Sequence, residues 1–381
     1  MALVPSLARL RVFASLLSPL LLTCDSLPEY NPAEAALYLQ YARASFCDKD
    51  SIAQWDCGDM CEDAAIEPGS VRIFGPGTQC GVQGYVALLP GTSRCIMSFR
   101  GSVNSLNWET DAEIFLTKWP PPKAGSIPCP GCKVHAGFAL AYQELQGEVW
   151  QLTKELACNS VAVTGHSLGA AVATLASMDF RGSGFQVDAM WTFGSPRVGN
   201  AEFVASFINA SVRQGTQTPS WRVVHYHDPV PQGGPSDSFT HVPGEVYYSR
   251  REEDVFEVCG WTAQKPENAS CGSRTLSSLD VIEGLAAGDH VRYLNKTLQI
   301  KFMSEKCIST NSCRRQGFVS QRHLVFVSTV VGLAACCAGG LMMLAWQRWS
   351  LARAAQRCRG ARGVGISERL AESQVSMSRV V

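Results

Sequence analysis

The chain has 381 residues, which is more than an average domain but accommodates a single α/β domain of about 250 residues with additional segments. With 46% hydrophobic and 17% charged residues it can bury a sizeable core, which excludes an intrinsically disordered protein. The 33 Lys and Arg residues balance the 33 Asp and Glu residues, and this argues against a general nucleic-acid-binding protein. Residues 1–24 hold two Arg and no acid, and residues 347–381 hold seven Arg and two Glu, so the part between them has a net charge of −7.

The N-terminal segment predicts a signal peptide over residues 1–25. Arg9 and Arg11 precede the mostly apolar stretch Val12–Leu22, which is too short to span a bilayer. A buried N-terminal helix is the alternative interpretation.

The central part alternates predicted helices and strands. A helix is expected over 31–46, because Asn31, Pro32 and Glu34 provide a cap, an N1 proline and an N3 acid. Short β-rich runs at 84–89 and 95–99 flank a Pro-Gly turn. Further helices are predicted over 134–156, 168–179 and 201–208, and further strands over 160–164, 189–193 and 221–226. This alternation predicts an α/β fold with a mostly parallel sheet and helices on both faces.

The sequence G-H-S-L-G at residues 165–169 fits the G-x-S-x-G pattern of a nucleophilic serine between a strand and a helix. The glycines permit a turn too tight for larger residues, and this turn lifts the Ser167 hydroxyl clear of the sheet. The helix N-terminus supplies free N–H groups where an oxyanion would form. A serine in an ordinary strand–helix turn is the alternative.

A serine nucleophile needs a base, and the base needs an orienting acid. In α/β-hydrolases the chain order is serine, acid, histidine. Asp228 directly follows the strand predicted over 221–226, and His290 lies late enough to reach the serine from a final loop. His241 is interpreted as a structural loop histidine, and His323 borders the C-terminal apolar stretch.

Twelve of the 16 cysteines lie between residues 25 and 323, and an even number in an exported region predicts disulfides. Cys259–Cys271 and Cys307–Cys313 are expected as local pairs, and Cys47, Cys57 and Cys61 are expected close together. Glycosylation acceptors begin at Asn209, Asn268 and Asn295. The C-P-G-C segment at 129–132 offers a metal or redox motif as an alternative, but no second C-x-x-C accompanies it. No metal or other cofactor is expected.

The C-terminal part predicts a stalk over 299–322, a transmembrane helix over 323–346 and a basic cytoplasmic tail over 347–381. Leu324–Trp346 contains no charged residue, and as a helix it would reach roughly 34 Å, enough for a ~30 Å hydrocarbon core. The arginines that follow place the C-terminus in the cytosol. We therefore expect a single-pass type I protein whose domain at 26–298 is extracellular or lumenal. A glycolipid anchor and a buried core helix are the alternatives.

Several motifs occur in a fixed order: F-R-G-S at 99–102, N-W at 107–108, V-H-A-G-F at 134–138, G-H-S-L-G at 165–169, G-S-P-R-V-G-N at 194–200 and D-H-x-x-Y at 289–293. Together they resemble the class 3 lipase family, the filamentous-fungal triacylglycerol lipase type, over residues 30–295. The resemblance implies an α/β-hydrolase fold and a catalytic triad of Ser167, Asp228 and His290. It also implies an oxyanion hole formed by Ser102 with the backbone N–H of Leu168.

The resemblance further implies that the segment 103–115 is a lid over the serine. Its apolar side chains would cover the cleft in water and turn toward lipid at an interface; they are Val103, Leu106, Trp108, Ile114 and Phe115. An ordinary surface loop is the alternative.

The predicted function is a membrane-tethered serine acyl hydrolase that acts on lipid esters, with a lipid ester and a membrane as partners and no nucleic acid. A phospholipase A1 or a feruloyl-type esterase shares the same triad and is the main alternative. A catalytically dead lipase-fold receptor would have no physical reason to keep the triad and the oxyanion serine. The head group, the acyl-chain preference and the oligomeric state stay open.

Overall fold

A computed structural model of the chain describes residues 29–77, 81–101, 116–119, 129–214, 220–232, 238–260, 267, 271 and 276–298. All of them belong to the first of two compact units, Met1–Arg314. Within these ranges, no helix has the length and apolar character needed to cross a bilayer. Several predicted features lie outside the described residues: the signal peptide, Ser102, the lid segment 103–115, Asn268, Cys307, Cys313, the stalk, the transmembrane helix and the basic tail.

The centre of the domain is an eight-stranded sheet with the order β1-β2-β3-β6-β7-β8-β9-β10. The strands from β3 to β9 pair in parallel, whereas β1, β2 and β10 are antiparallel at the two sides. Their bounds are β1 Arg72–Phe74, β2 Gly84–Leu88, β3 Arg94–Phe99, β6 Ser160–His166, β7 Gln186–Phe193, β8 Ser220–His225, β9 Glu245–Tyr248 and β10 Phe256–Val258. Small two-stranded sheets pair β4 Leu116–Lys118 with β5 Lys133–His135, and β11 Arg292–Tyr293 with β12 Lys296–Thr297.

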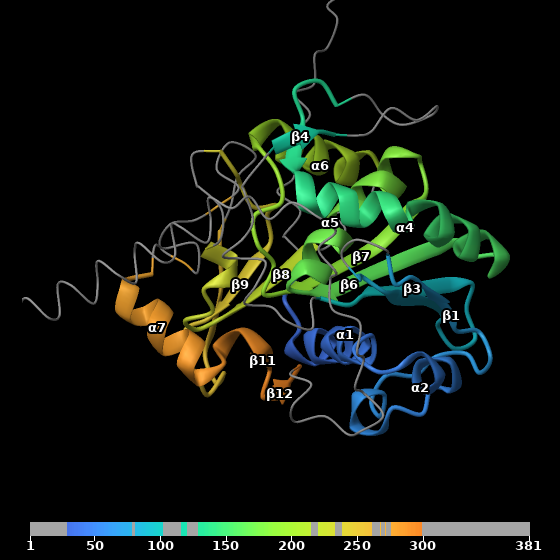
Figure 1. The fold of residues 1–381 in the computed structure, drawn as a ribbon, viewed down its shortest axis with the longest axis horizontal. Coiled ribbons are helices and arrows are strands. Elements are labelled where there is room, and N and C mark those ends of the chain that lie inside the picture. The colour runs from blue at the N-terminus through green and yellow to red at the C-terminus, as the bar shows by residue number, and fades with distance from the viewer. Residues whose placement is uncertain are drawn as a thin grey trace, which may run out of the picture. The chain divides into compact units, whose positions relative to one another are not determined.

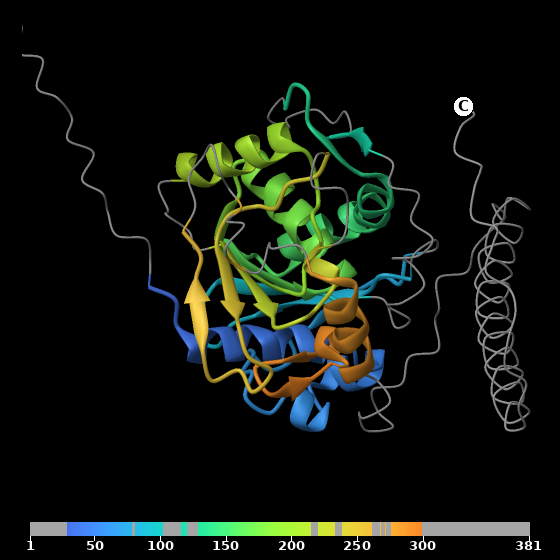
Figure 2. The same cartoon turned by 90° about the vertical axis from the view of Figure 1, so that its left-hand side faces the viewer.

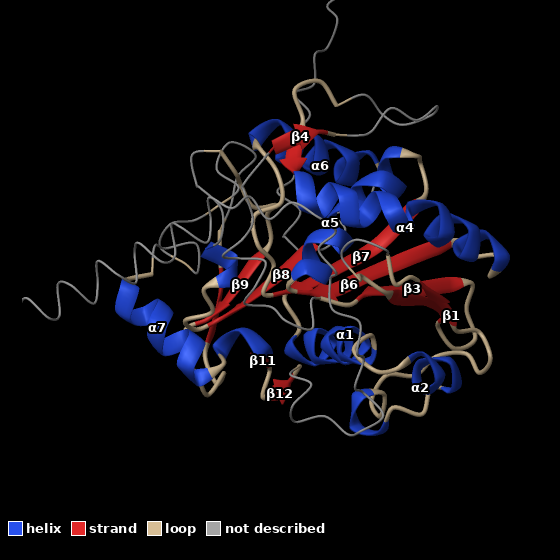
Figure 3. Cartoon of the chain, in the orientation of Figure 1, coloured by secondary structure: helices blue, strands red, loops and turns tan. Residues whose placement is uncertain are grey.

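Helices cover both faces of the large sheet (Figure 1, Figure 2). On one face lie α4 Ala136–Glu155, α5 Leu168–Gly182 and α6 Ala201–Arg213, and on the other lies α1 Pro32–Ala44. Each face has its own buried apolar cluster. Two shorter helices, α2 Lys49–Gln54 and α7 Ser278–Ala287, lie toward the outside (Figure 3). The predicted α/β fold with a mostly parallel sheet is confirmed.

Local capping explains where the predicted helices begin. The Asn31 side chain accepts hydrogen bonds from the backbone of Ala33 and Glu34, as expected for the start of α1. The helix predicted from residue 134 begins instead at Ala136, because Lys133–His135 pair as β5 and His135 Nδ1 accepts the N–H of Phe138 at 3.4 Å.

Four disulfides join described residues: Cys57–Cys61, Cys95–Cys158, Cys129–Cys132 and Cys259–Cys271. The predicted Cys259–Cys271 pair is confirmed. Cys47 is also disulfide-bonded. The C-P-G-C segment therefore holds an oxidised pair and not two thiolates.

Candidate active site

Ser167 stands at a sharp turn between β6 and α5. Its backbone has φ 58° and ψ −128°, a region that residues with a side chain rarely adopt. A Cβ at Gly165 would lie 2.4 Å from the carbonyl oxygen of Gly169, and a Cβ at Gly169 would lie 2.2 Å from that of Phe99. Both glycines of the pattern are thus required by the packing of the turn against itself and against β3.

The structure brings three predicted site residues into one hydrogen-bonded chain. His290 Nε2 lies 2.8 Å from Ser167 Oγ, and His290 Nδ1 lies 3.0 Å from each carboxylate oxygen of Asp228. The serine follows β6, the aspartate follows β8, and the histidine lies in a short 3₁₀ turn, Asp289–Val291. All three side chains are buried. This arrangement can deprotonate the serine hydroxyl.

The environment of Asp228 keeps its carboxylate ionised. Burial by itself would raise the pKa of Asp228, but the positive charge that His290 can carry and the hydrogen bonds that the carboxylate accepts hold it below its ordinary value. The donors are the His290 ring, the Tyr293 hydroxyl and the Val230 N–H. An ionised Asp228 accepts a hydrogen bond from the proton on Nδ1, so Nε2 is left to accept the proton of Ser167.

Two buried residues beside this chain have supporting contacts that sequence reasoning missed. The hydroxyl of Tyr293 donates to Asp228 Oδ2. The ring of His166 donates from Nε2 to the backbone carbonyl of His290 at 2.7 Å. Burial, together with the positive charge that His290 can carry, lowers the pKa of His166 to about 3, so this ring stays neutral. The motif D-H-x-x-Y contains Tyr293, but nothing in the sequence assigns its partner.

The turn that carries His290 is anchored through its neighbour Asp289. Arg251 donates two hydrogen bonds to the Asp289 carboxylate, at 2.9 and 3.1 Å. His225 Nδ1 donates to the Asp289 carbonyl at 2.9 Å. Gly288 ends α7 with φ 73°, which redirects the chain into this turn.

Gly194, the first residue of the G-S-P-R-V-G-N motif, lies against the hydrogen-bonded chain. Its φ is 58°, and a Cβ there would lie 2.9 Å from Asp228 Oδ2 and 3.1 Å from His290 Cε1. A larger residue would therefore displace either the acid or the histidine.

The predicted oxyanion hole is described only in part. Leu168 is the first residue of α5, so its N–H has no acceptor within the helix. Gly101, which closely follows the end of β3, lies beside the serine, since a Cβ there would be 3.2 Å from Ser167 Cβ. This contact places Gly101 next to Ser167, and Ser102 itself lies outside the described residues.

The other predicted residues have no hydrogen bond to the three residues of this hydrogen-bonded chain among the contacts described. His241 is buried and its Nε2 donates to the Pro231 carbonyl at 2.7 Å, which agrees with a structural role. Asn209 on α6 and Asn295 in the β11–β12 turn are exposed, as glycosylation requires. Among the described residues, Glu245, Cys259 and Cys271 are close enough for a metal site, but the disulfide removes both thiolates as ligands.

Comparison with known proteins identifies the family of this chain. The family model "Lipase (class 3)" matches residues 96–237. The secreted mono- and diacylglycerol lipase 1 of Fusarium solani is 35% identical over 263 residues, which are 65% of this chain and 68% of that protein. The chain belongs to the class 3 lipase family. It is therefore an ester hydrolase, and its sheet and helices form the α/β-hydrolase fold.

Solved structures give the same result. This class 3 lipase resembles the crystal structure of a lipase from Rhizopus microsporus var. chinensis with a TM-score of 0.56 at 25% identity, covering 70% of this chain and 88% of that one. It also resembles a triacylglycerol lipase described as having a serine protease triad as its catalytic centre. There the TM-score is 0.53 at 26% identity, over 70% of this chain and 95% of that one.

Proposed function

We propose that this class 3 lipase cleaves carboxylic esters of lipids through an acyl-enzyme on Ser167, with His290 as general base and Asp228 as orienting acid. The observation that carries the proposal is the position of His290, which is within hydrogen-bonding distance of both Ser167 and Asp228. A serine that was only structural would not need a histidine on one side and a buried carboxylate behind it.

The reaction follows from these positions. Ser167 Oγ attacks the ester carbonyl carbon while its proton moves to His290 Nε2. The negative oxygen that forms accepts hydrogen bonds from the Leu168 N–H and, in this proposal, from Ser102. His290 then gives the proton to the leaving alcohol. Water then attacks the carbonyl carbon of the acyl-enzyme while His290 takes its proton. The fatty acid leaves as His290 returns the proton to Ser167 Oγ.

Asp228 contributes by staying charged throughout. Its carboxylate fixes the ring orientation of His290 and stabilises the imidazolium that forms when the ring takes the serine proton. The buried Tyr293 and the Val230 N–H keep that carboxylate in place.

The substrate class in this proposal is an acylglycerol. The names of the relatives, a mono- and diacylglycerol lipase and a triacylglycerol lipase, support this choice. A phospholipase A1 or a feruloyl-type esterase would use the same three residues and differ in the pocket.

The proposal includes a tethered, exported enzyme. The apolar stretch Leu324–Trp346 would hold the domain at a membrane, with the N-terminal signal peptide directing it out of the cytosol. The disulfides among the described residues support an oxidising compartment. The segment 103–115 would act as the lid.

The test is hydrolysis of a panel of tri-, di- and monoacylglycerols and phosphoglycerides by the full-length protein, beside the Ser167→Ala variant. We expect acylglycerols to be cleaved and the variant to be inactive. Cleavage of phosphoglycerides alone would favour the phospholipase, and no serine-dependent hydrolysis of any ester would reject the proposal.

A further inference from the structure

Helix α7 exposes its large apolar side chains to solvent. On a surface helix the apolar side chains normally face the core and the charged ones face water. In α7 the three largest apolar side chains are exposed instead: Leu279 by 77%, Ile282 by 63% and Leu285 by 43%. At 100° per residue, side chains three residues apart are offset by about 60° around the helix axis, so these three lie on one side of the helix and form one ridge. We call Leu279, Ile282 and Leu285 the α7 ridge.

The opposite side of α7 is fixed to the body of the domain. Gly284, about 200° around the helix from Ile282, is buried against the turn that precedes the proposed acid. A Cβ at Gly284 would lie 2.1 Å from the carbonyl oxygen of His227. Only glycine permits this approach, so the face that carries Gly284 must point inward and the ridge must point outward.

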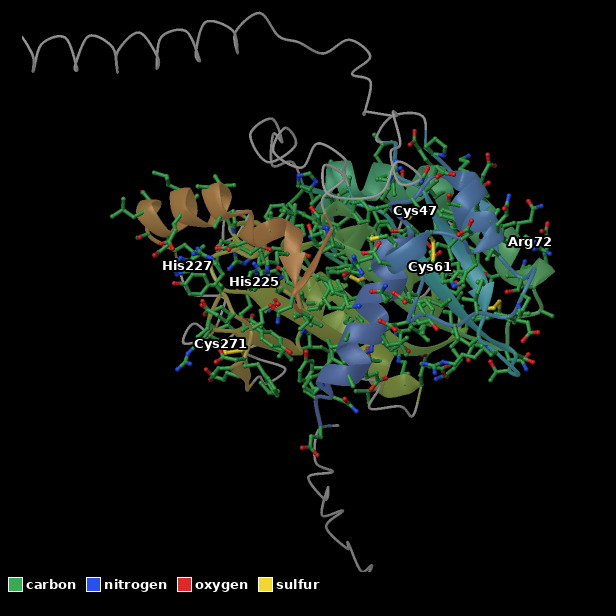
Figure 4. All side chains as sticks on the ribbon, turned by 90° about the horizontal axis from the view of Figure 1, so that it is seen from below. Cys47, Cys61, Arg72, His225, His227 and Cys271 are labelled. Atoms are coloured by element: carbon green, nitrogen blue, oxygen red, sulfur yellow. A yellow bond between two sulfur atoms is a disulfide. The ribbon has the colours of Figure 1, made fainter. Side chains whose placement is uncertain are left out.

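Charged groups fix the same orientation. Asp280 and Glu283 lie 3.7 and 3.8 Å from the two ring nitrogens of His227, and Glu283 also accepts a hydrogen bond from Arg251 at 3.0 Å. Figure 4 shows His227 beside this helix. A rotation of α7 that buried the ridge would break these contacts, so the exposure of the ridge is built into the fold.

The helix that carries the ridge leads into the turn of the proposed base. Gly288 ends α7, and Asp289 and His290 follow at once. The inner side of α7 touches His227, whose next residue is Asp228. The helix that exposes the ridge is thus joined along the chain to the turn of the proposed base, and its inner side packs against the residue before the proposed acid.

The size of the ridge indicates what covers it. Three side chains of this type offer on the order of 100 Å² each. A stable protein interface buries about 800 Å² on each partner, so a second copy of the chain would need much more surface than the ridge provides. A fluid apolar phase has no such minimum, and insertion of each side chain adds independently.

We propose that the α7 ridge inserts into the lipid surface that holds the substrate. The proposed ester hydrolysis would take place while the ridge is inserted in that surface. This inference rests on the proposed function. It assigns to α7 a lipid contact separate from the segment 103–115 and from the C-terminal apolar stretch. Insertion here would bring the His290 turn to the boundary between water and acyl chains.

The test compares two esters of the same leaving group on the full-length protein reconstituted in phosphatidylcholine vesicles. p-Nitrophenyl butyrate is presented in the water, and p-nitrophenyl palmitate is presented in the bilayer. The triple variant Leu279→Ser, Ile282→Ser, Leu285→Ser should lose at least about tenfold of the palmitate rate, since each lost apolar side chain weakens insertion. Its butyrate rate should stay within about twofold of the wild type.

Val212→Ser is the matched control, because Val212 is an apolar side chain 70% exposed on a different helix, α6. Both of its rates should stay within about twofold. If the triple variant unfolds at a lower temperature, the single variant Leu279→Ser replaces it in the test. Its palmitate rate should fall by about threefold and its butyrate rate should not change.

The outcomes separate the two ideas. Ester cleavage that persists in Ser167→Ala rejects the proposed function itself. With Ser167→Ala inactive, a triple variant that keeps the palmitate rate, or loses both rates equally, overturns the lipid contact of α7. Light scattering tests the other occupant: a dimer of the full-length protein that becomes a monomer in the triple variant would assign the ridge to a second copy.

Discussion

Tyr293 donates its hydroxyl hydrogen to the carboxylate of Asp228, so the carboxylate that orients His290 is held from two sides. Both side chains are buried, and water cannot replace a lost donor. The hydrogen bond is one reason why the pKa of Asp228 stays below its ordinary value despite burial.

Tyr293→Phe should therefore reduce both stability and activity. We expect the free energy of unfolding at pH 7 to fall by about 1–3 kcal/mol, the usual cost of removing a hydrogen bond to a charged group. The folded pKa of Asp228 should rise in the variant. A carboxylate pKa that folding depresses stabilises the fold fully above the unfolded pKa, and this contribution is lost as the pH falls through the folded pKa. In the variant the contribution should therefore be smaller, and its loss should be complete at a higher pH.

Tyr142→Phe is the control for this prediction. Tyr142 is also buried and donates to a carboxylate, Asp179, at 2.7 Å, but the contact joins α4 to α5 away from the serine. It should lower stability by a similar amount and leave the turnover of folded enzyme unchanged. Equal effects of the two variants on turnover would show that Tyr293 has no special role at Asp228.

Gly169→Ala should disrupt the turn that carries Ser167. The new Cβ would lie 2.2 Å from the Phe99 carbonyl oxygen, which is backbone and cannot move without shifting β3. We expect a loss of several kcal/mol in stability, as overpacking costs ~1–3 kcal/mol even where side chains can adapt. Urea unfolding and the rate on a soluble ester measure this.

Gly147→Ala provides the comparison, because Gly147 lies inside α4 and a Cβ added there would meet no atom within 4 Å. Alanine there should raise stability by roughly 0.5–1 kcal/mol through helix propensity. A destabilised Gly147→Ala, or a fully active Gly169→Ala, would contradict this interpretation of the glycines.

The stability of the protein should fall as the medium becomes acidic. Burial lowers the pKa of His135 to about 4 from an ordinary value of 6.5, so the unfolded chain binds a proton that the folded chain does not. Above pH 6.5 neither state is protonated at His135 and the ring has no effect on stability. As the pH falls from 6.5 toward 4, the proton that only the unfolded chain binds increasingly favours unfolding. The sign is therefore a loss of stability on acidification.

His135→Asn isolates this contribution. Asparagine keeps an acceptor for the cap of α4 and removes the titrating ring. Between pH 6.5 and pH 5 the variant should lose less unfolding free energy than the wild type, by at most about 2 kcal/mol. Parallel slopes of stability against pH for the two proteins would reject the assignment.

The Cys95–Cys158 disulfide should contribute more stability than the other described pairs. It closes a loop with a separation of 63 residues, whereas Cys129–Cys132 has a separation of 3. If disulfides act through loop entropy, Cys95→Ala with Cys158→Ala should cost about 4 kcal/mol, and the paired change at 129 and 132 about 2 kcal/mol. A larger loss from the short loop, measured by thermal unfolding, would contradict this order.

The sequence predicted those parts of the fold that depend on local chemistry. Asn31 and Pro32 indicated the start of α1, and the alternation of strands and helices between 160 and 226 indicated the parallel sheet. Cys95–Cys158 could not be predicted, because the pairing depends on β3 lying parallel to β6, with Cys95 opposite Val161. β9 was missed, since four residues after a turn give no periodicity.

The candidate site was likewise predictable only where it depends on the local sequence. Ser167 is predictable because glycines and a helix start surround it in sequence. Asp228 and His290 were chosen by chain order and by family resemblance. The contacts of Tyr293, Arg251 and His166 join segments 38 to 124 residues apart and become visible only when the chain is folded.

The most direct test of the proposed mechanism is labelling of the full-length protein with a fluorophosphonate, which reacts with an activated serine. We predict one labelled peptide, the one that contains Ser167, with no labelling in Ser167→Ala and labelling slowed by orders of magnitude in His290→Ala and Asp228→Asn. Labelling that persists in Ser167→Ala, or that maps to another serine, would contradict the mechanism.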